Sequence, residues 1–159
     1  MGVAKRNVKT ELLPNGSANV TFEFNLENFG NVDLGNISLI DNLLLAFPAS
    51  CSVTVMSLTS DDFIVNPAFN GTGNNNLLAP NNDLPVGDKG AVLLTINVAN
   101  CAANQTTFIN TATAGGTSPG GTAVSDESNN GSDPRTCGAR SLLPATNPGS
   151  RSTASRMVS

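Results

Sequence analysis

The chain has 159 residues, of which 39% are hydrophobic and 13% charged, with a formal net charge of −4 and no His, Tyr or Trp. This length suits one domain with a buried core, and eight basic residues in a net negative chain exclude the basic surface that nucleic-acid binding requires. The absence of His removes the commonest general base and metal ligand, and no run of about 18 apolar residues could span a membrane. We therefore expect a protein that is not an enzyme.

Charge and composition divide the chain unevenly. Residues 1–133 hold all 12 acidic residues and four of the basic ones, whereas residues 134–159 hold four arginines and no acid. The second part is rich in Ser, Thr, Pro and Arg without any apolar period, so it cannot bury enough surface to offset its ordering entropy. We predict a folded unit at 1–133 followed by a disordered tail at 134–159.

The N-terminal residues lack the basic and apolar regions of a secretory signal. Strand-like sequence starts at Gly2, directly after Met1. We expect that this chain carries no signal peptide and is a module or fragment of a longer extracellular or cell-surface protein.

The apolar residues recur with a period of two, which is typical of strands with one buried face. In chain order, the pattern predicts strands at 3–11, 18–28, 36–40, 51–59, 90–100, 107–114 and 121–126. Turns rich in Gly, Pro and Asn separate these segments, and no stretch longer than about one turn has a helical period.

These segments predict an all-β fold: an immunoglobulin-like, two-sheet antiparallel sandwich of about seven strands. The predicted core consists of the inward members of the alternating runs. They are Val20, Phe22, Phe24, Leu26, Ile37, Leu39, Val53, Val55, Val92, Leu94, Ile96, Val98 and Phe108.

Two of the three cysteines flank predicted strands. Cys51 begins one strand and Cys101 follows another, and we predict a disulfide between them that joins the two sheets of an extracellular domain. The alternative is a pair of buried free thiols in a reducing compartment. With Cys51 and Cys101 bonded, Cys137 is the odd thiol and is able to cross-link chains.

A calcium site is the weaker candidate. Asp126, Ser128 and Asn130 place oxygen ligands at a spacing of two, and Gly131 follows at the position of a sharp turn. The pattern then fails, because Cys137 occupies the twelfth position where a Glu would be needed. Solvated turn side chains are the simpler interpretation, so we expect no obligatory cofactor.

Other catalytic constellations are disfavoured. Glu23 and Glu27 could suggest glycoside hydrolysis, but their alternation with buried positions predicts surface residues, and no Tyr or Trp offers a platform for sugar. Nucleophilic triads need a His that this chain lacks.

Several phrases in order resemble one known family. "ENFGNVDL" at 27–34, "VNPAFNGTGNNNLL" at 65–78 and "ATAGGTSPGGTAVSD" at 112–126 are its most specific parts. On these residues, 2–134 resemble the conserved-repeat β-sandwich domain of bacterial cell-surface proteins, a DUF-eleven-like domain of unknown function. The resemblance implies an immunoglobulin-like unit that occurs in tandem in long secreted or wall-attached proteins, and it carries no catalytic residues. Two features depart from it: one copy is present, and the Arg- and Ser-rich tail replaces the usual Asp-rich continuation.

The resemblance implies a structural or adhesive module that acts as a spacer or stalk repeat, with neighbouring repeats or surface-protein domains as partners. Two alternatives stay open. The loops at 61–90 could bind a protein or glycan ligand, or the first strand, at 1–11, could pair with the sheet edge of a neighbouring subunit in a filament.

Overall fold

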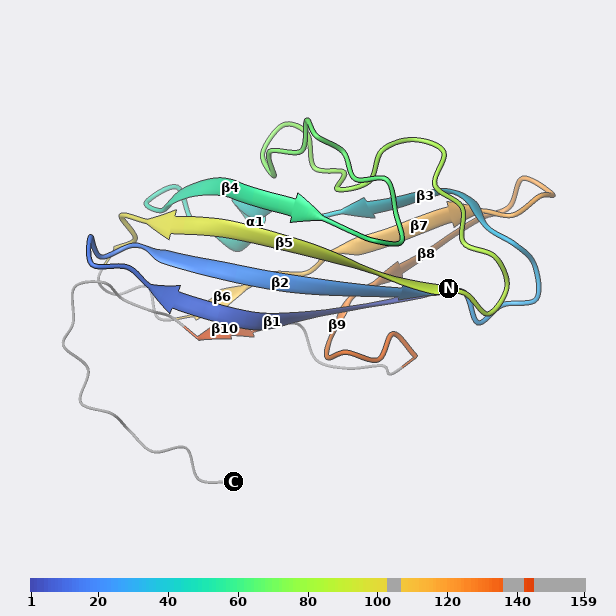
Figure 1. Ribbon diagram of the computed structural model, residues 1–159, viewed down its shortest axis with the longest axis horizontal. Coiled ribbons are helices and arrows are strands. Elements are labelled where there is room, and N and C mark those ends of the chain that lie inside the picture. The colour runs from blue at the N-terminus through green and yellow to red at the C-terminus, as the bar shows by residue number, and fades with distance from the viewer. Residues whose placement is uncertain (103–106, 136–141, 145–159) are drawn as a thin grey trace, which may run out of the picture.

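The structure is a computed structural model that describes residues 1–102, 107–135 and 142–144 (Figure 1). Strands are the main regular structure of these residues, and one four-residue helix, α1 (Leu43–Ala46), follows the third strand. The strands are β1 (Gly2–Leu12), β2 (Ala18–Glu27), β3 (Gly35–Ile40), β4 (Ser52–Thr59), β5 (Lys89–Ala99), β6 (Thr107–Ile109), β7 (Thr113–Thr117), β8 (Ala123–Glu127), β9 (Asn129–Asn130) and β10 (Leu142–Pro144). None of the helices in the described ranges is both long and apolar enough to cross a membrane.

Two sheets lie face to face. The first has the strand order β4-β5-β2-β1-β9, the second has the order β3-β7-β8, and β6 pairs separately with β10. All pairings are antiparallel except the short parallel one between β1 and β9. Figure 1 shows β4, β5, β2 and β1 side by side in one layer, with β3, β7 and β8 in the layer behind. The predicted all-β sandwich is confirmed.

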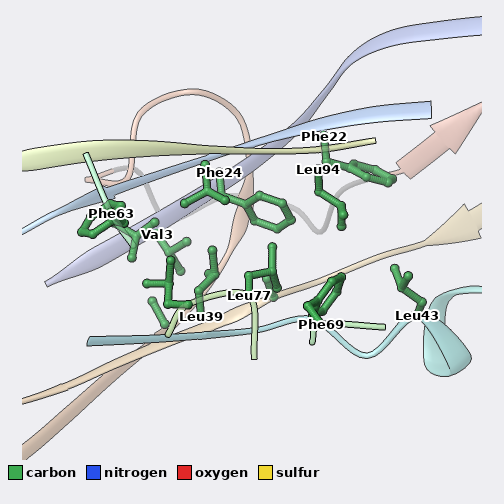
Figure 2. Packing of buried hydrophobic residues seen from close by; sticks show 14 of the residues in the cluster. Val3, Phe22, Phe24, Leu39, Leu43, Phe63, Phe69, Leu77 and Leu94 are labelled. Carbon is green, nitrogen blue, oxygen red and sulfur yellow. The ribbon is translucent and has the colours of Figure 1, made fainter. Parts of the chain in front are cut away.

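The core lies between these layers. In the first sheet Phe22 pairs with Leu94 and Phe24 with Val92, so the aromatic side chains of β2 lie beside the aliphatic ones of β5 on one face. Figure 2 shows Phe22, Phe24 and Leu94 pointing toward the opposite layer, which contains Leu39. All predicted core residues are buried except Val53 and Val55, which are half-buried and pack against the cluster.

The segment between β4 and β5 contributes core residues that periodicity missed. Its buried members are Phe63, Phe69, Leu77, Leu78 and Leu84. The segment is held to β3 and its approach by backbone hydrogen bonds, among them Leu77 N–H to Leu39 O at 2.8 Å and the reciprocal pair of Leu34 and Leu84. Much of the stretch proposed as a binding loop, 61–90, is therefore part of the sandwich.

Two predicted strands differ in detail. The segment 107–114 divides into β6 and β7, which pair with different partners, with residues 110–112 between them. In β4 Met56 is exposed, as a period of two from Val53 and Val55 predicts, but the pairing shifts between Val55 and Ser57, so Leu58 takes the next inward place. A bulge of one residue reverses the faces of the residues that follow, which a strict period of two cannot predict.

Most of the predicted tail, 134–159, lies outside the described residues. Of its described parts, Arg135 donates a hydrogen bond to Glu27, and Leu142–Pro144 pairs with β6. The backbone carbonyl of Pro134 lies against Gly2, so close that a side chain at Gly2 would collide with it. Contacts of the sandwich therefore continue past the predicted boundary at residue 133.

Candidate functional site

A lysine lies in the apolar core. Lys5 pairs with Phe24 in the β1–β2 register, so its side chain shares the inward face with Phe24 and Phe22, and it is completely buried. Its ammonium lies 4.5 Å from the centroid of the Phe22 ring and 4.9 Å from that of Phe24. These ring faces attract a cation, but they do not replace the water that Lys5 gives up.

The opposite sheet supplies the counter-charge. Asp41 follows β3 on the same face as Ile37 and Leu39, and it is completely buried. Lys5 Nζ donates a hydrogen bond of 2.6 Å to Asp41 Oδ2, and the Asp41 backbone N–H is held by Asn75 O at 2.9 Å. The ion pair therefore connects the first strand to the second sheet across the core.

Burial controls the protonation of this lysine. Desolvation lowers the pKa of Lys5 from its ordinary value of 10.5, although the charge of Asp41 and its hydrogen bond act to raise that pKa. Removing water disfavours the charged form of an amine. Lys5 is therefore more readily present as a neutral, nucleophilic amine than an exposed lysine would be.

A third polar side chain belongs to the same interior. Asn110 lies between β6 and β7 and is 1% exposed. Neither its amide nitrogen nor its amide oxygen has a hydrogen-bond partner within the described part of the chain, and the same holds for Asp41 Oδ1. Such groups are rare in folded proteins because an unmade hydrogen bond in the interior costs free energy.

Two of the residues predicted as calcium ligands accept hydrogen bonds from backbone N–H groups of β1 and of the segment before β7. Asp126 Oδ2 accepts a hydrogen bond from the Val3 backbone N–H at 2.9 Å. Ser128 is buried, and its hydroxyl accepts the Ala112 N–H at 2.9 Å. Asn130 pairs with Lys5 through β9. No group of three or more acidic, Cys or His side chains able to hold a metal occurs in the described ranges, and calcium binding stays a prediction.

The predicted disulfide is present, but its position corrects one expectation. Cys51 and Cys101 are bonded, with an S–S distance of 2.07 Å. They lie immediately beyond the Ser52–Ala99 pair of β4 and β5, which are neighbours in one sheet. The bridge therefore closes the end of one sheet and does not join the two sheets. Cys137 lies outside the described residues.

The other acidic candidates are engaged in surface or edge contacts. Glu23 pairs with Arg6 across β1 and β2, and Glu27 pairs with Arg135. Glu27 is 8% exposed, so the prediction that it is a surface residue was wrong. Its carboxylate pairs with Arg135, and residues 132–134 line the same hollow of the surface.

The sequence held a signal for the buried cluster. Lys5 has the parity of Val3, Asp41 that of Leu39, and Asn110 that of Phe108, so each is a polar residue on an apolar face. Parity marks Asp41 and Asn110 as inward, but it does not mark Lys5, because Asn7 and Lys9 follow it at the same parity. No local pattern shows that Lys5 and Asp41 form an ion pair.

Comparisons with known proteins concern the fold. No protein-family model matches the sequence, and no curated protein matches it either. Among solved structures, the full-length major pilin SpaD from Corynebacterium diphtheriae aligns at 20% identity with a TM-score of 0.47, over 80% of this chain and 33% of that chain. This chain therefore spans about a third of the length of that pilin.

Two single-domain structures align over most of both chains. The collagen-binding subdomain of the Enterococcus faecalis surface protein ACE is 10% identical, with a TM-score of 0.37, over 91% of this chain and 97% of that one. A collagen-binding domain from a Staphylococcus aureus adhesin is 13% identical, with a TM-score of 0.30, over 82% and 98%. These low identities and scores leave function to be argued from the residues of this chain.

Proposed function

We propose that this chain is a non-catalytic structural or adhesive module of a bacterial extracellular or cell-surface protein, and that it acts as a spacer or stalk repeat. Its resemblance to the conserved-repeat domain of bacterial surface proteins motivates the assignment. Its partners are neighbouring repeats or domains of the same surface protein.

One observation carries the mechanical part of the proposal: the buried polar groups fasten strands together. The Lys5–Asp41 pair spans the two sheets, and Asp126 and Ser128 bond to backbone N–H groups of β1 and of the segment before β7. A disulfide adds to this fastening and is typical of proteins in oxidising compartments. Polar groups committed to such contacts suit a load-bearing module better than a catalytic cleft.

Two experiments test this proposal: antibody labelling of intact cells tests the surface location, and arrays of immobilised proteins and glycans test for a ligand. An antibody raised against the chain should label the bacterium that produces it without permeabilisation, and the purified chain should be monomeric and retained by no immobilised protein or glycan. Labelling only after permeabilisation would refute the surface assignment. Retention on an array would refute the spacer role and favour the alternative that the chain is a binding module.

The filament alternative is less well supported by the edge of β1. Beyond its two residues paired to β9, this edge has a register shift between Asn7 and Lys9, which leaves Val8 unpaired, and it carries Arg6, Lys9 and Glu11. Bulges and charges on an edge oppose pairing with another chain. Because β1 also carries the core residues Val3 and Lys5, its deletion would disrupt the sandwich, so the intact chain is the material for this test. We expect a monomer in gel filtration, and an oligomer of defined size would favour the filament.

A further inference from the structure

Three buried polar side chains from distant parts of the sequence share one region of the core. Lys5, Asp41 and Asn110 have exposed fractions of 0%, 0% and 1%. Lys5 Nζ donates a hydrogen bond to Asp41 Oδ2. Asp41 Oδ1 and the side-chain amide nitrogen and oxygen of Asn110 have no hydrogen-bond partner among the described residues. The ion pair explains why Lys5 and Asp41 can be buried, but it does not explain the burial of Asn110.

The register of the second sheet places Asn110 beside Asp41. Leu39 pairs with Ala114 and Ile40 with Thr113. Continuing that antiparallel register by one residue puts Asp41 opposite Ala112, and Asn110 is the next residue of its strand on the same face. Diagonal neighbours on one face of two antiparallel strands are within reach of each other's side chains.

The connection from β8 to β9 links the same region to the first sheet. Ser128 holds the backbone of Ala112 through its own N–H at 2.8 Å and through its hydroxyl at 2.9 Å. The next two residues form β9, in which Asn130 pairs with Lys5. This short connection holds the strand with Lys5 against the segment with Asn110, and Lys5 Nζ lies 2.6 Å from Asp41. The registers on both sides therefore place the segment that carries Asn110 next to the Lys5–Asp41 pair.

We propose that Lys5 and Asn110 form a spontaneous amide cross-link, an isopeptide bond, once the chain has folded. The lone pair of the neutral Lys5 amine attacks the Asn110 side-chain carbonyl carbon, Cγ. The new Nζ–Cγ bond forms, the Cγ–Nδ2 bond breaks, and one molecule of ammonia leaves. One hydrogen passes from Nζ to the departing nitrogen, so the step balances without an oxidant, a cofactor or a second protein.

Asp41 serves as the proton carrier for this step. Transfer of the ammonium proton within the ion pair leaves a neutral amine beside a protonated carboxyl group, and an apolar surrounding favours the uncharged pair. The carboxyl group can then donate to Asn110 Oδ1, accept the hydrogen from the attacking nitrogen and pass it to Nδ2, so that it is regenerated. The lowered pKa of Lys5 and the fixed positions of the groups favour the attack.

The cross-link would complement the disulfide. Cys51–Cys101 joins two neighbouring strands of the first sheet, whereas a Lys5–Asn110 bond joins the first sheet to the second. The two bonds together would tie β1, β4, β5 and the segment before β7 into one covalently closed unit.

The intact mass of the full chain, measured in denaturant with reductant present, tests the proposal. We expect a mass lower than the sequence mass by one ammonia molecule, and a proteolytic fragment in which the Lys5 peptide is bonded to the Asn110 peptide. A folded chain with the full sequence mass would overturn the proposal. Loss of one water molecule instead would also overturn it, because that product would join Lys5 to Asp41.

Variants separate this bond from other reactions that release ammonia, such as succinimide formation at Asn-Gly sequences. Asn110→Ala keeps the Lys5–Asp41 ion pair and should fold but retain the full mass; loss of ammonia in that variant would refute Asn110 as the electrophile. Lys5→Met should also retain the full mass, whereas the exposed-lysine control Lys9→Met should lose ammonia like the parent chain.

The role of Asp41 has a separate readout. Asp41→Asn keeps the shape of the side chain but cannot carry the proton, so the folded variant should gain the cross-link about a hundred-fold more slowly than the parent when the mass is followed from the moment of cell-free synthesis. An unchanged rate would refute the proton carrier. These masses and rates do not depend on where the protein is located or what it binds. The cross-link can therefore be refuted while the proposed function holds, and the proposed function can be refuted while the cross-link holds.

Discussion

The disulfide provides the most quantitative prediction for this chain. Cys51 and Cys101 are 50 residues apart in sequence, and the bond between them closes a loop of that length in the unfolded chain. In the chain-entropy model, closing such a loop removes about 4 kcal/mol of conformational entropy from the unfolded state. Replacing both cysteines by Ala should therefore lower the free energy of unfolding by about 4 kcal/mol.

Chemical and thermal denaturation measure this loss. For a domain of this size, each kcal/mol shifts the melting temperature by roughly 2–4 °C, so the double variant should melt about 8–16 °C below the parent chain. Cys137→Ala is the matched control, since it removes a thiol and leaves the bridge intact. A loss below about 1 kcal/mol, or equal stability of the oxidised and reduced parent chain, would refute the reasoning.

Three further predictions concern the core and its polar cluster. Phe22→Ala should lower the free energy of unfolding by about 3–5 kcal/mol in urea titration, because the ring is fully buried and its removal leaves a cavity. Gly71→Ala should cost about 1–3 kcal/mol by thermal melting, since the residue has a φ of +70° and an added Cβ would lie 2.3 Å from Leu43 Cδ1. In an Asn110→Ala background, stability should rise with pH between the lowered pKa of Lys5 and its ordinary value of 10.5, because the unfolded chain binds the extra proton over that interval.

Each of these predictions has a matched control. Leu45→Ala, at a side chain that is 84% exposed, should change stability by less than about 0.5 kcal/mol. Gly87→Ala has a similar φ of +79° but open space around the added Cβ, so it should cost less than Gly71→Ala; equal costs would show that the contact with Leu43 does not matter. Lys5→Met combined with Asn110→Ala should abolish the alkaline rise in stability, and a rise that persists would assign the titration to another group.

Alternation along the chain was sufficient to predict the sandwich. The run from Val20 to Leu26 fixed the buried face of β2, because a side-chain period of two leaves one face for the core and one for water. The pairing of Cys51 with Cys101 also followed from their places at the ends of predicted strands. The sequence did not predict that β4 and β5 belong to the same sheet, because strand order depends on which strands pair in the folded domain.

Two parts of the structure could not be predicted from local sequence patterns, because they depend on long-range contacts. The segment from Phe63 to Leu84 has no period, since its apolar side chains reach the core from turns and isolated bridges rather than from a regular strand. The inward position of Leu58 depends on a bulge, and a one-residue change in pairing leaves little trace in composition.

The sequence by itself determined which faces of the central strands are apolar, and the inward parity of Asp41 and Asn110, two residues after Leu39 and Phe108, can be read from it. Only the tertiary structure decided that Lys5 on β1 meets Asp41 after β3. This contact arises because two sheets pack face to face and the connection to β9 holds the first strand against the second layer. Side-chain direction is a local property of the backbone, whereas proximity between residues of different sheets depends on the packing of the whole domain.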